Sequence, residues 1–143
     1  MTRHPDPGAF SLDRLRSALA EYGVDLTPPP DWEADAPLAA ALWIYTGLGA
    51  PNPPDLLRAL SGRPREDWPR AARQIEADWS GGIGGLLLVR IARHLLDPAA
   101  PVPVPQQLAV HLDPYERDLA RAATAAATAA APDTTDDTTW RNA

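Results

Sequence analysis

The chain of 143 residues contains no cysteine and no lysine, and each absence excludes a class of chemistry. Without cysteine there is no disulfide framework, no thiolate zinc site and no cysteine nucleophile. Without lysine there is no Schiff base and no phosphate-binding lysine of the Walker type. All 13 positive charges are therefore arginines. The missing lysines, the 17 prolines and the abundant alanine favour a GC-rich bacterial genome, such as that of an actinomycete.

Long apolar runs and a basic excess are lacking as well. The uncharged stretch 36–50 spans only 15 residues, and the apolar stretch 83–96 contains two arginines. Both fall short of the roughly 20 residues that a membrane-spanning helix needs. The polar, proline-rich start also lacks the apolar segment of a secretory signal. The net charge is −6, and only residues 63–97 have no acidic excess. We therefore expect a cytoplasmic protein that binds neither membranes nor nucleic acid.

Aromatic residues are few, with one Phe and three Tyr against five Trp, so Leu and Trp must supply most of the core. Apolar residues recur at helical spacing, and no stretch alternates as a strand would. We predict an all-α fold, a compact bundle of about five main helices with proline-rich connections. Residues 1–10 are expected to be a flexible start, residues 11–131 a single helical domain, and residues 132–143 a disordered acidic tail.

Capping residues and first-turn prolines predict where the helices begin and end. The main helices are expected over residues 11–22, 35–47, 67–79, 83–96 and 113–131, with short ones over residues 55–60 and 106–112. Ser11 and Asp67 are the expected N-caps, and the second main helix is expected to start near Asp35 with Pro37 in its first turn. Asp113 with Glu116 resembles a capping box. The second of the main helices is apolar on all sides, which predicts that it is buried.

Four glycines lead into an apolar helix in the sequence WSGGIGGLLLVRIARHLL, residues 79–96. A helix N-terminus offers free N–H groups and the positive end of a dipole, and glycines let a ligand approach them. The start of this helix is therefore a candidate site for a phosphate, sulfate or carboxylate, at Ser80, Gly81, Gly82, Gly84 and Gly85. The pattern matches neither a Walker loop nor a dinucleotide fingerprint. Close packing of a neighbouring helix or of Trp79 against the glycines explains it equally simply, and we favour that interpretation.

A polar ridge follows on the same helix, because Arg90, Arg93 and His94 fall in one sector of the helical wheel. A helix that is buried on three sides exposes its fourth side, so a solvated face is the simplest interpretation. Two arginines and a histidine at this spacing are also suited to a carboxylate or phosphate of a partner or ligand.

Catalytic and metal-binding patterns are missing from the sequence. His4, His94 and His111 belong to different segments, and no HExxH, ExxH or GxSxG motif is present. Neighbouring carboxylates such as Glu66 and Asp67 suit a helix start better than an acid–base dyad. We therefore expect no catalytic site, no metal site and no cofactor.

The acidic tail contains Trp140 and Arg141, and tryptophan is enriched at binding hot spots. A short docking peptide over residues 136–142 is one interpretation, and an end without function is the one we favour. Taken together, the patterns predict a small acidic protein that acts through protein–protein contacts, as an adaptor, accessory subunit or assembly factor. Its partner is expected to be another protein or a second copy of the chain. The alternative is a binding module for a small anionic ligand at residues 80–85.

Overall fold

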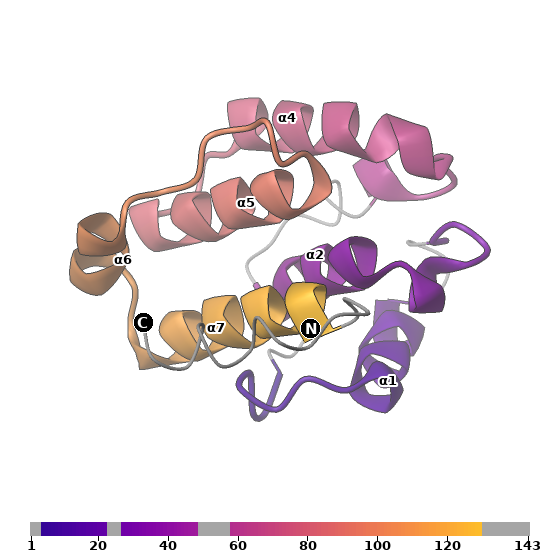
Figure 1. Cartoon of the computed structure of the whole chain (residues 1–143), viewed down its shortest axis with the longest axis horizontal. Helices are drawn as coiled ribbons and strands as arrows, with labels where there is room; N and C mark the ends of the chain where they lie inside the picture. The colour runs from indigo at the N-terminus through magenta and orange to yellow at the C-terminus, as the bar shows by residue number, and fades with distance from the viewer. Residues whose placement is uncertain (1–3, 23–26, 49–57, 130–143) are drawn as a thin grey trace.

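The computed structural model describes residues 4–22, 27–48 and 58–129, and every regular element in these ranges is helical (Figure 1). Five helices have 11 or more residues: α1 (Leu12–Tyr22), α2 (Ala36–Gly47), α4 (Trp68–Asp78), α5 (Ile83–Leu96) and α7 (Pro114–Ala129). Three shorter ones are η2 (Trp32–Ala34), η3 (Arg65–Asp67) and α6 (Pro105–His111). The all-helical prediction is confirmed for the described ranges, and five longer helices agree roughly with the number expected.

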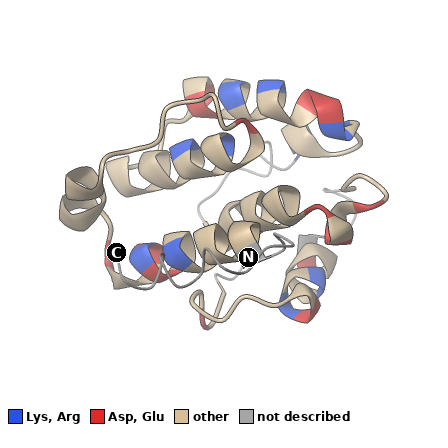
Figure 2. Ribbon diagram, viewed as in Figure 1, with Lys and Arg blue, Asp and Glu red and all other residues tan. Residues whose placement is uncertain are grey.

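Helix α2 forms the centre of the molecule, where it packs against α1, α5 and α7. Its sequence carries no charge, and every residue from Leu38 to Gly47 is buried. Figure 2 shows that the charged residues lie instead on the surrounding helices and at the turn before α2. The helix begins as predicted, since Asp35 accepts a hydrogen bond from the Leu38 amide at 3.2 Å and Pro37 lies in the first turn. Within the described ranges, no helix combines the length and apolarity that crossing a membrane requires.

Helix α4 lies over α5 and buries the face that carries Trp68, Ala71, Ala72 and Ile75. Asp67 is the N-cap residue of α4, as predicted, but its side chain makes no capping hydrogen bond. The single turn of η3 runs directly into α4, so Asp67 already has helical backbone angles. Its carboxylate accepts a hydrogen bond from Arg70 at 3.1 Å instead.

The capping box at the start of α7 is confirmed. The Glu116 amide donates to the Asp113 carboxylate at 2.7 Å, and the Asp113 amide donates to the Glu116 carboxylate at 3.0 Å. Ser11 likewise caps α1 by accepting from the Arg14 amide at 3.1 Å. Of the short helix predicted over residues 55–60, only residues 58–60 are described, and they are helical. The expected tail at residues 132–143 lies outside the described residues.

Residues 4–10, part of the segment expected to be a flexible start, pack onto α2 and α7 in this structure. The His4 ring stacks on the Trp43 ring with centroids 3.7 Å apart, and the Trp43 indole donates to the Pro7 carbonyl at 2.9 Å. The His4 amide donates to the Tyr115 hydroxyl at 2.9 Å. The Tyr115 hydroxyl in turn donates to the Gly47 carbonyl at 2.7 Å. Residues 4–10 therefore belong to the folded domain although they are polar and rich in proline. They shield the Trp43 ring of α2 and give its indole N–H a hydrogen-bond acceptor.

Candidate functional site

The glycine-rich start of α5 is occupied by a side chain of the protein itself. A Cβ atom added to Gly81 or Gly85 would lie 2.6 or 2.5 Å from Cζ2 of Trp79, so the indole ring rests directly on both glycines. The Trp79 indole also donates to the Gly82 carbonyl at 3.1 Å. The geometry thus favours the packing interpretation, in which glycine provides room for a neighbouring ring.

Gly84 faces a carboxylate from another helix. A Cβ atom there would lie 2.6 Å from Oε1 of Glu116, which comes from the first turn of α7. A carboxylate beside a helix N-terminus is stabilised by the helix dipole, and it repels a second anion from the same place. Anion binding by residues 80–85 therefore gains no support from this arrangement, although Ser80 and Gly82 are exposed.

The polar ridge of α5 is only partly exposed, because its side chains contact neighbouring segments. Arg90 and Arg93 both reach Glu76 on α4, with Nε–Oε2 and Nη1–Oε1 distances of 3.4 and 3.1 Å. His94 Nδ1 lies 2.7 Å from the Ala100 carbonyl oxygen. Because that oxygen only accepts, Nδ1 carries the hydrogen. These contacts could not be predicted from the pattern of α5 itself, because Glu76 belongs to the neighbouring helix and Ala100 to the connection after α5.

Two buried polar atoms near the ridge lack a hydrogen-bond partner among the described residues: the Tyr45 hydroxyl and Nε of Arg93. Burial, and to a smaller extent the negative charge of Glu76, raises the pKa of Tyr45. The phenol therefore stays neutral and cannot act as a base at neutral pH.

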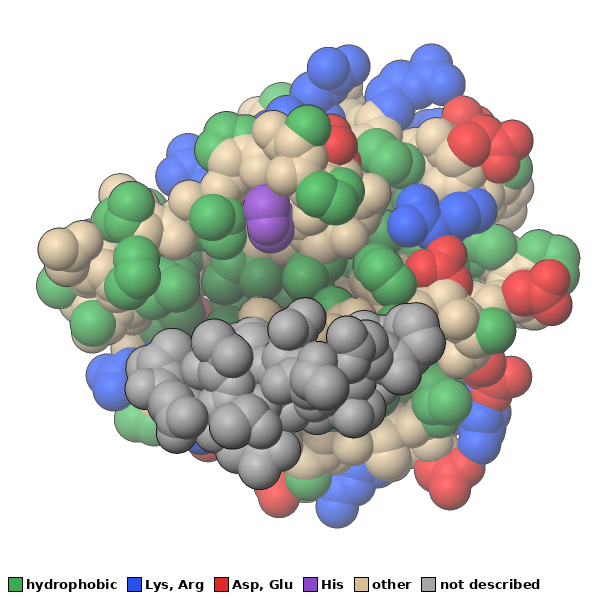
Figure 3. Space-filling model, in the orientation of Figure 1, with side chains coloured by type: hydrophobic (Ala, Val, Ile, Leu, Met, Phe, Trp, Pro, Cys, Tyr) green, Lys and Arg blue, Asp and Glu red, His purple; other side chains and the backbone are tan. Residues whose placement is uncertain are grey.

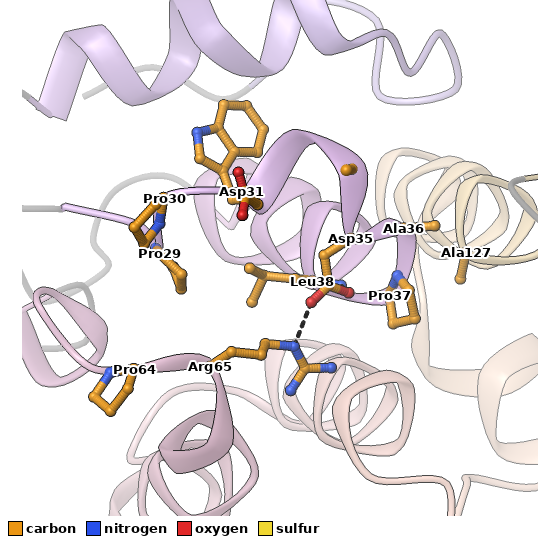
Figure 4. Close-up of a pocket in the computed structure, with 12 residues that line it drawn as sticks. Pro29, Pro30, Asp31, Asp35, Ala36, Pro37, Leu38, Pro64, Arg65 and Ala127 are labelled. Carbon is orange, nitrogen blue, oxygen red and sulfur yellow. Dashed lines mark hydrogen bonds and ion pairs between the residues drawn. The ribbon is translucent and has the colours of Figure 1, made fainter.

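A groove of about 780 Å³ opens where η2 and the start of α2 face Pro64 and Arg65 (Figure 4). We call it the proline groove, because four of its lining residues are prolines, with Trp32 and Leu38 between them. The apolar residues that line it include Pro29, Pro30, Trp32, Pro37, Leu38 and Pro64. The sequence analysis missed this groove, because its walls come from segments more than 25 residues apart, around residues 30 and 64 and at Ala127.

Asp35 holds the two sides of the proline groove together. One carboxylate oxygen caps α2, and the other accepts from Nε of Arg65 at 2.5 Å, as Figure 4 shows. Arg16 of α1 pairs with Glu33, which ties η2 to the body of the molecule. Asp31 adds an exposed carboxylate at the rim. The groove is thus an apolar surface edged by the Asp35–Arg65 ion pair and by the exposed carboxylate of Asp31.

A second apolar surface lies over α6 and the connection before it, where hydrophobic side chains gather in Figure 3. Val102 and Val104 are about half exposed there, and Val110 is 75% exposed. These valines lie at the surface of the molecule, and Val102 also lines the edge of a smaller cavity next to α5.

The described residues hold no group of three or more side chains placed to bind a metal ion. His4 is buried on Trp43, His94 bonds to the backbone, and His111 lies exposed on α6, so the structure does not bring the histidines together. Trp140 and Arg141 lie outside the described residues. Comparison with known proteins gave no significant match to a family model, to a curated protein or to a solved structure.

Proposed function

We propose that this protein acts through protein–protein contacts, as a cytoplasmic adaptor, accessory subunit or assembly factor. The observation that carries the proposal is the proline groove, an open apolar groove of about 780 Å³. Prolines and tryptophan lose little conformational freedom when a partner covers them, so a groove made of them binds at a low entropic cost. Its size falls in the range of sites that bury one or a few large side chains.

The groove favours a partner segment that inserts an apolar or aromatic side chain between Trp32 and Pro64. The exposed carboxylate of Asp31 would pair with a basic group on that segment, and the guanidinium of Arg65 with an acidic one. The partner is another protein or a second copy of this chain. A separate contact through Trp140 and Arg141, in residues 136–142, stays part of the proposal.

The test is the substitution Ala34→Glu, which adds a charge to the groove wall at an exposed position and leaves the core untouched. Ala109→Glu is the matched control, because Ala109 is exposed on α6, a helix that contributes nothing to the groove. A partner captured from the host by the unmodified chain is identified, and its affinity for each variant is measured by calorimetry. We expect Ala34→Glu to weaken binding about tenfold or more, which corresponds to about 1.4 kcal/mol.

The Ala109→Glu variant should bind as the unmodified chain does, and circular dichroism should show both variants folded. Equal binding by all three proteins would place the contact away from the groove. Sedimentation of the unmodified chain over a range of concentrations tests the second copy, since a dimer through the groove would dissociate on introducing Ala34→Glu but not Ala109→Glu.

A further inference from the structure

A cavity of about 280 Å³ lies between α4, α5 and the connection that runs back beside them to α6 (Figure 1). We call it the arginine cavity, because Arg90 and Arg93 line it together with the Glu76 carboxylate. The rest of its lining includes Pro101, Pro103 and Gln107. Its volume is near the lower end of the range for ligand sites, which suits a small molecule rather than a polypeptide.

The charges in the arginine cavity do not balance. Two guanidinium groups face one carboxylate, so the cluster carries one net positive charge. Each arginine reaches Glu76 through a single nitrogen, at 3.4 Å for Arg90 and 3.1 Å for Arg93, rather than through a paired fork. Among the described residues, both Nη groups of Arg90 and one of Arg93 therefore remain for another acceptor.

A donor of Arg93 that stays unpaired among the described residues is a second indication that the cavity holds a ligand. Nε of Arg93 is buried, and no described residue accepts its hydrogen bond. A buried donor without an acceptor is costly, and native structures usually explain one by a bound water, ion or ligand. Arg93 contacts Glu76 at an ordinary distance but through Nη1 alone, so a carboxylate in the cavity would add an acceptor for its guanidinium.

We propose that the arginine cavity binds a small monocarboxylate. Its carboxylate lies on the free Nη groups of Arg90 and Arg93, its short apolar part lies against Pro101 and Pro103, and the Gln107 amide donates a further hydrogen bond. The single net positive charge of the cluster suits a monoanion, since the Glu76 carboxylate would repel a dianion such as phosphate. This site is separate from the proline groove and does not depend on the proposed partner contact.

The first test titrates the full chain with propionate at constant ionic strength, followed by ¹H–¹⁵N NMR, with inorganic phosphate in a parallel titration. We expect saturable shifts around Arg90, Arg93 and Gln107 with propionate, a dissociation constant on the order of millimolar, and weaker binding of phosphate. Arg90→Gln should weaken propionate binding about tenfold, the effect of losing one bidentate charge-assisted pair. Arg70→Gln is the control, because Arg70 is an exposed arginine that pairs with Asp67 on the outside of α4.

The second test is Glu76→Gln, for which a ligand site and a purely structural ion pair predict opposite results. If the cavity binds a carboxylate, removal of the Glu76 charge raises the affinity for propionate about threefold or more, because a repelling group is lost. A purely structural cluster would lose stability and bind nothing. The proposal is overturned if no saturable shifts appear up to about 100 mM propionate. At that concentration even a site with a binding free energy of only a few kcal/mol is filled. Equal binding by Arg90→Gln, or tighter binding of phosphate than of propionate, overturns it too.

Discussion

At the scale of single residues, the glycines before and within α5 are explained by space rather than by backbone conformation. Among the described residues only Gly62 has a positive φ, at 75°, so Gly81, Gly82 and Gly85 do not need the freedom that glycine alone provides. Gly81 and Gly85 are glycine because the Trp79 ring lies where a Cβ atom would be. Gly82 has no such neighbour and is the N-cap of the helix.

Gly85→Ala should therefore destabilise the protein. The new Cβ would lie 2.5 Å from the Trp79 ring, whose indole is also held by its hydrogen bond to Gly82. We expect the free energy of unfolding to fall by about 1–3 kcal/mol, the usual cost of overpacking a tight contact. Urea denaturation measures the loss.

Gly82→Ser is the control at the N-cap of the same helix. It introduces a side chain where no described atom lies within 4 Å, at a φ of −71° that serine adopts without strain. Because serine caps a helix and stiffens the unfolded chain, we expect stability to stay equal or to rise by up to about 1 kcal/mol. A similar loss for both variants would show that the Trp79 contact does not explain the glycines.

At the scale of elements, Asp35 decides how α2 begins and where η3 lies. Its carboxylate caps the helix with one oxygen and holds Arg65 with the other, so the same residue starts the central helix and shapes the proline groove. The cap was predictable from the sequence, because aspartate before a first-turn proline is typical of a helix start. The ion pair was not, since Arg65 lies 30 residues away.

Asparagine and alanine at this position separate the two contributions. Asp35→Asn keeps an oxygen for the cap and removes the ion pair, which is partly exposed, so we expect a loss of about 0–1 kcal/mol. Asp35→Ala also removes the cap, and we expect about 1 kcal/mol more. Urea denaturation of both variants gives the comparison, and equal losses would mean that the cap contributes little.

At the scale of the whole molecule, the segment from His4 to Phe10 packs across α2 and α7, which also contact each other directly. Its His4 amide bonds to Tyr115 of α7, and Phe10 meets the edge of the Trp43 ring that His4 covers from its face. The imidazole Nε2 lies 3.1 Å from the Trp43 carbonyl, which only accepts, so Nε2 carries the hydrogen. Burial lowers the pKa of His4, and the Trp43 hydrogen bond opposes this only in part.

This lowered pKa predicts that stability falls in mild acid. The unfolded chain takes up a proton on His4 near pH 6.5, while the folded chain resists protonation until lower pH. The stability that neutral His4 contributes is thus present above pH 6.5 and is lost as the pH falls toward the folded pKa, by at most about 1.4 kcal/mol per pH unit. Urea denaturation at about pH 7.5 and about pH 5.5 tests this in the range where histidine titrates.

His4→Gln is the control, because glutamine does not titrate. Its stability should change less between the two pH values than that of the unmodified chain, whatever its stability at neutral pH. His94 and His111 are present in both proteins, so their contributions cancel. The same pH dependence in both proteins would show that His4 is not the group responsible.

The sequence by itself determined the helical class, the positions of most helices and the burial of α2, because these depend on local periodicity, caps and prolines. It also identified the segment around α5 as chemically distinctive. The tertiary structure decided what those residues contact: Trp79 and Glu116 at the glycines, Glu76 at Arg90 and Arg93, and residues 4–10 over Trp43. The proline groove and the arginine cavity arise only there as well. Each joins side chains from segments far apart in the chain, and local patterns do not specify which distant segments meet.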